Sequence, residues 1–180
     1  MIQLTELQKG LLEKNILEIT DEKINAETFY HVCESVFALI AKGSPDIEII
    51  ITSGGGSVEP GLAIYDLLRL YKGKKTGIVV GYAHSMAAII LQACEVRKAC
   101  KHAELLIHNI RRNDVSLDVL RDSEKLSKLR EEMEKDQKKH YEILSERTGR
   151  SIEEICRKCE EEIKLDANEA KEFGLIDEII

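Results

Sequence analysis

Two side chains in the middle of the sequence have the types that acyl-transfer chemistry requires. Ser85 lies in a stretch of small residues, 81–88, and an apolar run typical of a helix follows it directly. His108 ends a short apolar segment typical of a strand. A serine hydroxyl becomes a useful nucleophile when a histidine can accept its proton. Because serines also serve simply as helix caps, this pair predicts a hydrolytic site only if further features converge on it.

A glycine run provides a second feature. Residues 53–57 read Ser-Gly-Gly-Gly-Ser and follow a β-branched apolar segment, 47–51, that is typical of a buried strand. Glycines allow unusual backbone angles and let a ligand approach the main chain closely. The phosphate-binding pattern GxxxxGK[ST] is absent from this stretch. We therefore interpret the run as a place where a ligand could approach the backbone closely.

The elements around these residues alternate between strand and helix patterns. Strands are expected at 16–19, 47–51, 76–80 and 103–108, with helices between them at 26–42, 60–71 and 86–94. Such alternation indicates an α/β domain with a mostly parallel sheet. In a parallel sheet Ser85 and His108 would both follow strand ends on the same side, and the helix start after Ser85 would offer free N–H groups to an oxyanion.

The pattern changes after His108. Residues 115–147 contain almost no glycine or proline and predict one long, highly charged helix of roughly 45 Å. Its narrow apolar stripe would need a partner, and we expect a contact between subunits, with packing against its own domain as the alternative. The stripe consists of Leu126, Leu129, Met133, His140, Tyr141 and Leu144. A capping box at 151–154 then starts another helix, and a short helix from residue 165 and a strand at 175–180 complete the chain.

Composition excludes several classes of protein. A length of 180 residues fits one domain, 1–180, and the net charge of −7 argues against a nucleic-acid surface. No apolar run approaches the roughly 18 residues that a membrane helix needs, and the N-terminus does not resemble a secretory signal, so we expect a cytoplasmic protein. Of the five cysteines, Cys156 and Cys159 form a CxxC within a helical stretch with no second pair of ligands. We expect them to pack in a helix, and we expect no metal and no cofactor.

Four segments together resemble the ClpP family, the proteolytic subunits of ATP-dependent Clp proteases. Residues 53–66 resemble that family's glycine-rich strand and following helix, and residues 81–88 resemble its nucleophile turn. Residues 106–109 look like its histidine segment, and residues 165–177 look like its C-terminal helix and strand. The order and spacing of all four are specific, and the resemblance extends from about residue 11 to residue 180.

The resemblance implies the ClpP/crotonase fold with a protruding handle helix at about 115–147, and a serine endopeptidase without a cofactor. Ser85 would be the nucleophile and His108 the general base. The N–H groups of Gly55 and Met86 would form the oxyanion hole, and the extended backbone at Gly56, Ser57 and Val58 would pair with a polypeptide substrate. The handle would assemble a homo-oligomer, a heptameric ring and possibly a double ring that encloses a chamber. An AAA+ Clp ATPase would deliver unfolded polypeptide to it.

The third member of the triad departs from the pattern. The family's acid is an aspartate, and the matching position here is Glu162, with Glu161 and Asp166 as further candidates. A glutamate can orient a histidine and stabilise its charged form, but the longer side chain changes the geometry. Two alternatives therefore remain open: a catalytically weak or silent ClpP-like structural or regulatory subunit, and a crotonase-type acyl-CoA enzyme.

Overall fold

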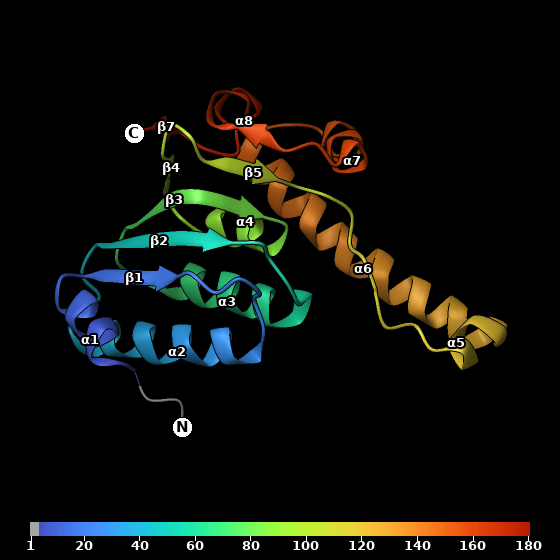
Figure 1. Cartoon of the computed structure of the whole chain (residues 1–180), viewed down its shortest axis with the longest axis horizontal. Coiled ribbons are helices and arrows are strands. Elements are labelled where there is room, and N and C mark those ends of the chain that lie inside the picture. The colour runs from blue at the N-terminus through green and yellow to red at the C-terminus, as the bar shows by residue number, and fades with distance from the viewer. Residues whose placement is uncertain (1–3) are drawn as a thin grey trace.

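The computed structural model describes residues 4–180 and shows a mixed α/β fold built on a central, mostly parallel sheet (Figure 1). The main path of the sheet runs β1-β2-β3-β4-β7, and β5 pairs with β3 and with β6. Every pairing is parallel except that of β5 with β6. The strands are β1 (Ile16–Ile19), β2 (Ile47–Ser53), β3 (Lys75–His84), β4 (Val96–Ala99), β5 (Glu104–Leu106), β6 (Leu165–Asp166) and β7 (Glu178–Ile179).

The described part of the chain contains eight helices in addition to this sheet. In Figure 1, α1, α2 and α3 lie beside the β1–β3 end, whereas α7 and α8 lie near β5 and the C-terminus. The helices are α1 (Glu6–Glu13), α2 (Ala26–Ala41), α3 (Val58–Leu70), α4 (Met86–Leu91), α5 (Leu117–Arg121), α6 (Ser123–Thr148), α7 (Ile152–Glu161) and α8 (Ala167–Phe173). The predicted strand–helix alternation and the parallel sheet are confirmed, and α1 is an element that the sequence patterns did not indicate.

The buried core is aliphatic because the chain has few aromatic residues and no tryptophan. Helix α4 is buried along its whole length, which its uniformly apolar sequence requires. Strand β2 is buried at every second residue, as the pleat of a strand dictates. These two elements anchor the segments on which the candidate site is built.

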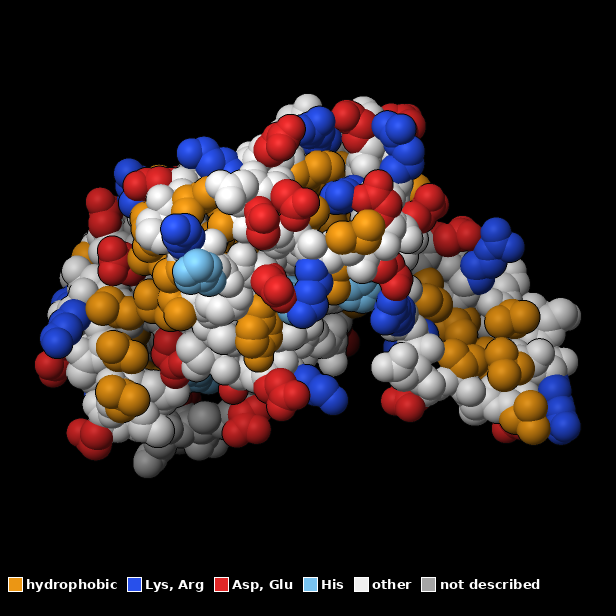
Figure 2. Space-filling model, turned by 45° about the horizontal axis from the view of Figure 1, so that its top comes forward, with side chains coloured by type: hydrophobic (Ala, Val, Ile, Leu, Met, Phe, Trp, Pro, Cys, Tyr) orange, Lys and Arg blue, Asp and Glu red, His pale blue; other side chains and the backbone are white. Residues whose placement is uncertain are grey.

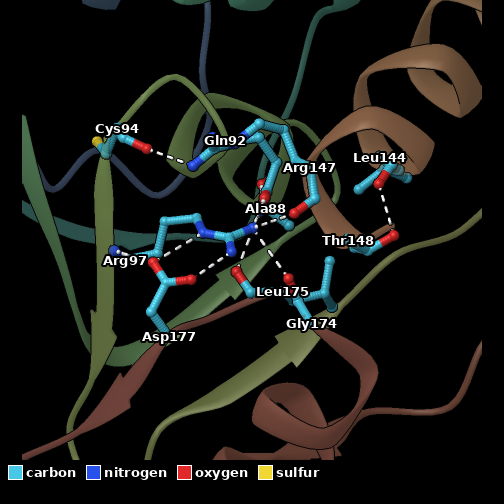
Figure 3. Close-up of polar contacts among 10 residues, drawn as sticks. All are labelled: Ala88, Gln92, Cys94, Arg97, Leu144, Arg147, Thr148, Gly174, Leu175 and Asp177. Atoms are coloured by element: carbon cyan, nitrogen blue, oxygen red, sulfur yellow. Dashed lines mark hydrogen bonds and ion pairs between the residues drawn. The ribbon is translucent and has the colours of Figure 1, made fainter. Parts of the chain in front are cut away.

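Strand β4 corrects the sequence-based expectation of a basic turn after α4. It carries Arg97, which is only 6% exposed, and Lys98, which pairs with Glu178. The Arg97 guanidinium bonds both oxygens of Asp177, the Gln92 side chain and two backbone carbonyls (Figure 3). Charged residues in a buried strand give no apolar pattern, so only their tertiary partners reveal the strand.

The long helix expected at 115–147 is two helices. Asp122 has an extended backbone, and its side chain accepts hydrogen bonds from the N–H groups of Glu124 and Lys125, 3.0 and 3.1 Å away. An aspartate in this conformation caps a new helix and ends the previous one, so α5 and α6 are separate. Together they form an arm that projects from the body of the molecule (Figure 1). No helix among residues 4–180 combines the length and apolar character needed to cross a membrane.

Figure 2 shows this arm separated from the body by a notch, with hydrophobic side chains gathered on the arm's visible face. The exposed apolar residues of α5 and α6 include Leu117, Leu120 and Leu126. At the other end of α6, His140 and Leu144 are buried against the body. The apolar stripe therefore contacts its own domain at the C-terminal end of α6, while the projecting end exposes leucines.

Candidate active site

Ser85 directly follows the C-terminal end of β3, a central strand of the sheet. The first half of β3 pairs with β4, and its second half pairs with β5, with His84 opposite Leu106. Gly81, at a positive φ of 82°, lies between the two halves and allows the change of partner. The Ser85 N–H then donates to the Leu106 carbonyl at 2.7 Å, so the pairing reaches the nucleophile candidate itself. His108 lies two residues beyond Leu106, and the two candidates thus follow neighbouring parallel strands.

Ser85 has a strained backbone, with φ 55° and ψ −123°. Residues other than glycine rarely adopt such angles, and the cost is about 1–3 kcal/mol. The sharp turn lies between β3 and α4, the arrangement in which hydrolases hold a nucleophilic serine exposed at a helix start. Met86 opens α4, and its N–H has no partner within the helix because first-turn amides point out of the helix end.

We expect the backbone strain at Ser85 to lower the free energy of unfolding by a measurable amount. The free energy of unfolding of Ser85→Gly should be about 1 kcal/mol higher than that of Ser85→Ala, because glycine adopts these backbone angles without strain. The relief of strain is larger than this difference, but glycine also makes the unfolded chain more flexible, which offsets part of it. Both variants lack the hydroxyl, so the comparison isolates the backbone. Urea unfolding of the two proteins measures the difference, and equal stabilities would show that the turn is unstrained.

The glycine run packs directly against this turn. A Cβ atom added to Gly55 would come within 2.6 Å of the His84 carbonyl oxygen, 2.7 Å of Ser85 Cβ and 2.9 Å of Met86 N. No side chain can occupy that space without displacing backbone. Gly55 is therefore required where it is, and it brings the loop backbone beside the first amide of α4.

One edge of the glycine run is already paired. The N–H of Ile24 donates to the Gly55 carbonyl, and the N–H of Ser57 donates to the Ile24 carbonyl, both at 2.8 Å. In this pairing the N–H of Gly56 points away from Ile24, and within residues 4–180 it makes no hydrogen bond. The opposite edge of the run is thus free to accept another extended chain.

The amide of Gly55 has a partner of its own, since it donates to Ser53 Oγ at 3.2 Å. Of the two predicted oxyanion donors, the Met86 N–H makes no hydrogen bond within residues 4–180, whereas the Gly55 N–H is shared with a buried serine. Gly56 provides a further free amide beside it. The assignment of Gly55 and Met86 as the oxyanion hole stays a prediction, and Gly56 is the donor that only the pairing with Ile24 brings to attention.

Ser85 and His108 line one cavity of about 200 Å³. The predicted substrate residues Gly56 and Val58 line it too, and Ser57 lies in an adjoining groove. The remaining walls come from the glycine run, α4, the segment after β5 and α6; they are Gly54, Met86, Ile89, Ile107, Ile110, Arg111, Asn113, His140 and Leu144. No sequence pattern indicated that Arg111 and His140 would line this cavity, because both reach it through tertiary packing.

His108 is held by its own neighbour. Its Nδ1 lies 2.7 Å from the Asn109 carbonyl oxygen, and the Asn109 side chain accepts a hydrogen bond from Tyr141 of α6 at 2.7 Å. When Nδ1 donates to that carbonyl, Nε2 is the nitrogen left to act as a base. A backbone carbonyl and the arm helix therefore take part in orienting the ring.

Glu162 ends α7 in a left-handed conformation and bonds Arg111, which follows β5. This hydrogen bond lowers the pKa of the Glu162 carboxyl, so it is ionised at neutral pH. The other candidate acids are used elsewhere: Glu161 pairs with Lys158 at 2.6 Å, and Asp166 caps α8. Glu162 remains the predicted triad acid, with Arg111 as a competitor for its carboxylate.

The two cysteines of the CxxC lie on α7, as expected. Cys159 is buried in the core, and Cys156 Sγ lies 3.6 Å from the Tyr141 hydroxyl. Burial raises the pKa of the Cys159 thiol to about 12, which keeps it protonated. Their role in this structure is packing between α7 and α6.

The comparison with known protein families agrees with this geometry. The family model described as Clp protease matches residues 3–180. The match includes the glycine run, the Ser85 turn, the His108 segment and the projecting arm. Because it extends over nearly the whole sequence, the chain belongs to the Clp protease family.

Proposed function

We propose that this protein is a serine endopeptidase of the ClpP type that cleaves unfolded polypeptides by acyl transfer. The observation that carries the proposal is the shared cavity, which is lined by Ser85 at a strained strand-to-helix turn, by His108 and by Met86, the first residue of α4. His108 would accept the Ser85 proton, and the hydroxyl oxygen would attack the substrate carbonyl. The amides of Met86 and the glycine run would stabilise the oxyanion that forms.

Substrate would bind as an added strand. The free edge of residues 56–58 can hydrogen-bond to the main chain of an extended peptide, which favours unfolded chains over folded ones. Main-chain pairing does not depend on sequence. Any preference would come from the side chain that enters the cavity next to Ser85.

We further propose an assembly in which the arm of α5 and α6 joins subunits of a homo-oligomer. Exposed leucines on a projecting helical arm are unusual on a monomer and are typical of an interface. A heptameric ring or a stacked double ring in the cytoplasm, supplied by an AAA+ Clp ATPase, is the arrangement that family membership suggests. Sedimentation of the purified protein tests the assembly, and a stable monomer would contradict it.

The direct test of the peptidase is a fluorophosphonate probe, which reacts covalently with activated serines. We expect stoichiometric labelling of the assembled protein near pH 7.5, with the label located on the peptide that contains Ser85 by mass spectrometry. Denatured protein is the control and should not react. Absence of labelling in the assembled protein would favour the silent-subunit alternative.

The role of Glu162 as the triad acid can be tested by substitution. Glu162→Gln should lower kcat/KM for a peptide substrate by about 30-fold, because the amide cannot stabilise the imidazolium. This loss is smaller than for a buried triad acid, since Glu162 is partly exposed and shared with Arg111. Arg111→Met should not lower the rate, because it frees the carboxylate for His108. An unchanged rate in Glu162→Gln would exclude this residue and leave the Asn109 carbonyl as the group that orients His108.

A further inference from the structure

His140 is a buried polar side chain with one ring nitrogen that has no partner in the described part of the chain. It is only 6% exposed, and within residues 4–180 its Nε2 atom makes no hydrogen bond. Buried polar atoms are nearly always paired, because leaving one unpaired costs free energy. The proposed chemistry at Ser85 does not use this residue, so its position requires another explanation.

His140 forms part of the same cavity as Ser85. The buried walls around it are otherwise apolar and come from Met86, Ile89, Ile107 and Leu144. Apart from Ser85 and His108, the other polar side chains of the cavity are those of Arg111 and Asn113, and both are exposed to water. His140 is thus the polar group that a substrate side chain would meet after leaving solvent.

The chemistry of His140 is that of a neutral imidazole. Burial lowers its pKa to about 4, so the ring carries no charge at neutral pH. One ring nitrogen then donates a hydrogen bond and the other accepts one. Such a group pairs well with an amide or a hydroxyl, and it gives a carboxylate or an ammonium no opposite charge.

We propose that His140 is a specificity-determining residue that selects substrates with a neutral hydrogen-bonding side chain, such as glutamine, at the residue whose carbonyl Ser85 attacks. The inference rests on the proposed peptidase function, because it assigns the side-chain cavity of that site. A site built with a buried polar group discriminates against ligands that leave the group unpaired. An apolar side chain of similar shape, such as methionine, would fill the cavity and leave Nε2 without a partner.

The test uses two peptides that differ only in glutamine or methionine at the cleaved position, with the full-length assembled protein. We expect kcat/KM to favour glutamine by about tenfold in the wild type. His140→Leu should reverse this preference by lowering the value for glutamine and raising that for methionine. His140→Gln, which restores a neutral hydrogen-bonding group, should recover part of the glutamine preference.

Controls separate side-chain selection from damage to the site. His102→Leu replaces an exposed histidine outside the cavity and should leave both rates unchanged. A small alkyl fluorophosphonate carries no side chain that could contact His140, so it should still label Ser85 in His140→Leu. A glutamine-to-methionine ratio that is the same in His140→Leu as in the wild type would overturn the inference.

The role of His140 can also be tested if the protein has no peptidase activity, by measuring peptide binding. If neither peptide is hydrolysed, fluorescence anisotropy with Ser85→Ala still measures whether the glutamine peptide binds about tenfold more tightly than the methionine peptide. Loss of that difference in the Ser85→Ala/His140→Leu protein would support the role of His140 without any catalysis. Equal binding of both peptides to Ser85→Ala would overturn it.

Discussion

Replacing Ser85 with alanine is expected to lower kcat/KM for peptide hydrolysis by about a thousandfold or more. The hydroxyl oxygen would form the covalent bond to the substrate, and no other residue of the described chain that lines the cavity carries a hydroxyl or a thiol. Removal of a nucleophile from an acyl-transfer site has effects of this size or greater, and the remaining rate comes from the oxyanion donors and from binding. Hydrolysis of a fluorogenic peptide, followed together with fluorophosphonate labelling, measures the loss.

A matched substitution shows whether the effect is specific to the site. Ser116 directly precedes α5, and its side chain makes no capping hydrogen bond, so Ser116→Ala should retain wild-type hydrolysis. Ser85→Ala should keep the assembly of the wild type in sedimentation, since Cβ and the backbone geometry are retained. Full activity in Ser85→Ala would eliminate Ser85 as the nucleophile.

The largest loss of stability is expected at Arg97, which is remote from the cavity. Arg97→Met should lower the free energy of unfolding by about 4 kcal/mol, as measured by urea denaturation. Methionine fills much of the same volume but leaves Asp177, the Gln92 side chain and two carbonyl groups without their donor (Figure 3). Although Asp177 is partly exposed, Arg97 is buried and bonds several acceptors, and each buried acceptor left without a donor costs about 1–3 kcal/mol.

The adjacent residue of β4 is the matched control. Lys98 pairs with Glu178 at 2.8 Å, and half of the Glu178 side chain is exposed. Exposed pairs contribute at most about 1 kcal/mol, so Lys98→Met should change stability little. If the two substitutions proved equally mild, the Arg97 cluster would not stabilise the join between β4, β7 and α6.

The Arg97 cluster also carries a pH dependence with a defined sign. Hydrogen bonds from Arg97 lower the pKa of Asp177 although burial alone would raise it. A carboxyl with a lowered folded-state pKa contributes stability above its unfolded-state pKa and loses it as the pH falls through the folded-state value. In Arg97→Met this contribution should be absent, so the stability gap between wild type and variant should narrow in acid.

The segments that carry the candidate site could be predicted because each has a pattern contained within a few neighbouring residues. The glycine run, the Ser85 turn and the apolar sequence of α4 each have a local physical reason: a close backbone approach, a strand-to-helix turn and a buried helix. The periodicity of β1, β2, α2 and α3 likewise reports which face is buried. These features need no knowledge of distant partners.

Other features depend on contacts between segments far apart in the sequence. Strand β4 was missed because Arg97 is buried by Asp177, which lies 80 residues away. The break at Asp122 was missed because the charged pattern of the arm continues through it, although a capping aspartate was visible in the sequence. Arg111 gave no signal, since its partner Glu162 is 51 residues away.

The sequence by itself determined the parallel α/β architecture, the Ser85 and His108 candidates and the ClpP-type family. Periodicity, glycine placement and motif order are properties of neighbouring residues, so one chain is enough to read them. Only the tertiary structure decided which groups share the cavity, that Glu162 bonds Arg111, and that His140 lines the cavity of Ser85 with an Nε2 atom that has no partner within residues 4–180. These contacts depend on how α6 and the C-terminal segment pack against the sheet. Packing between segments far apart in the chain produces no periodic pattern in the sequence.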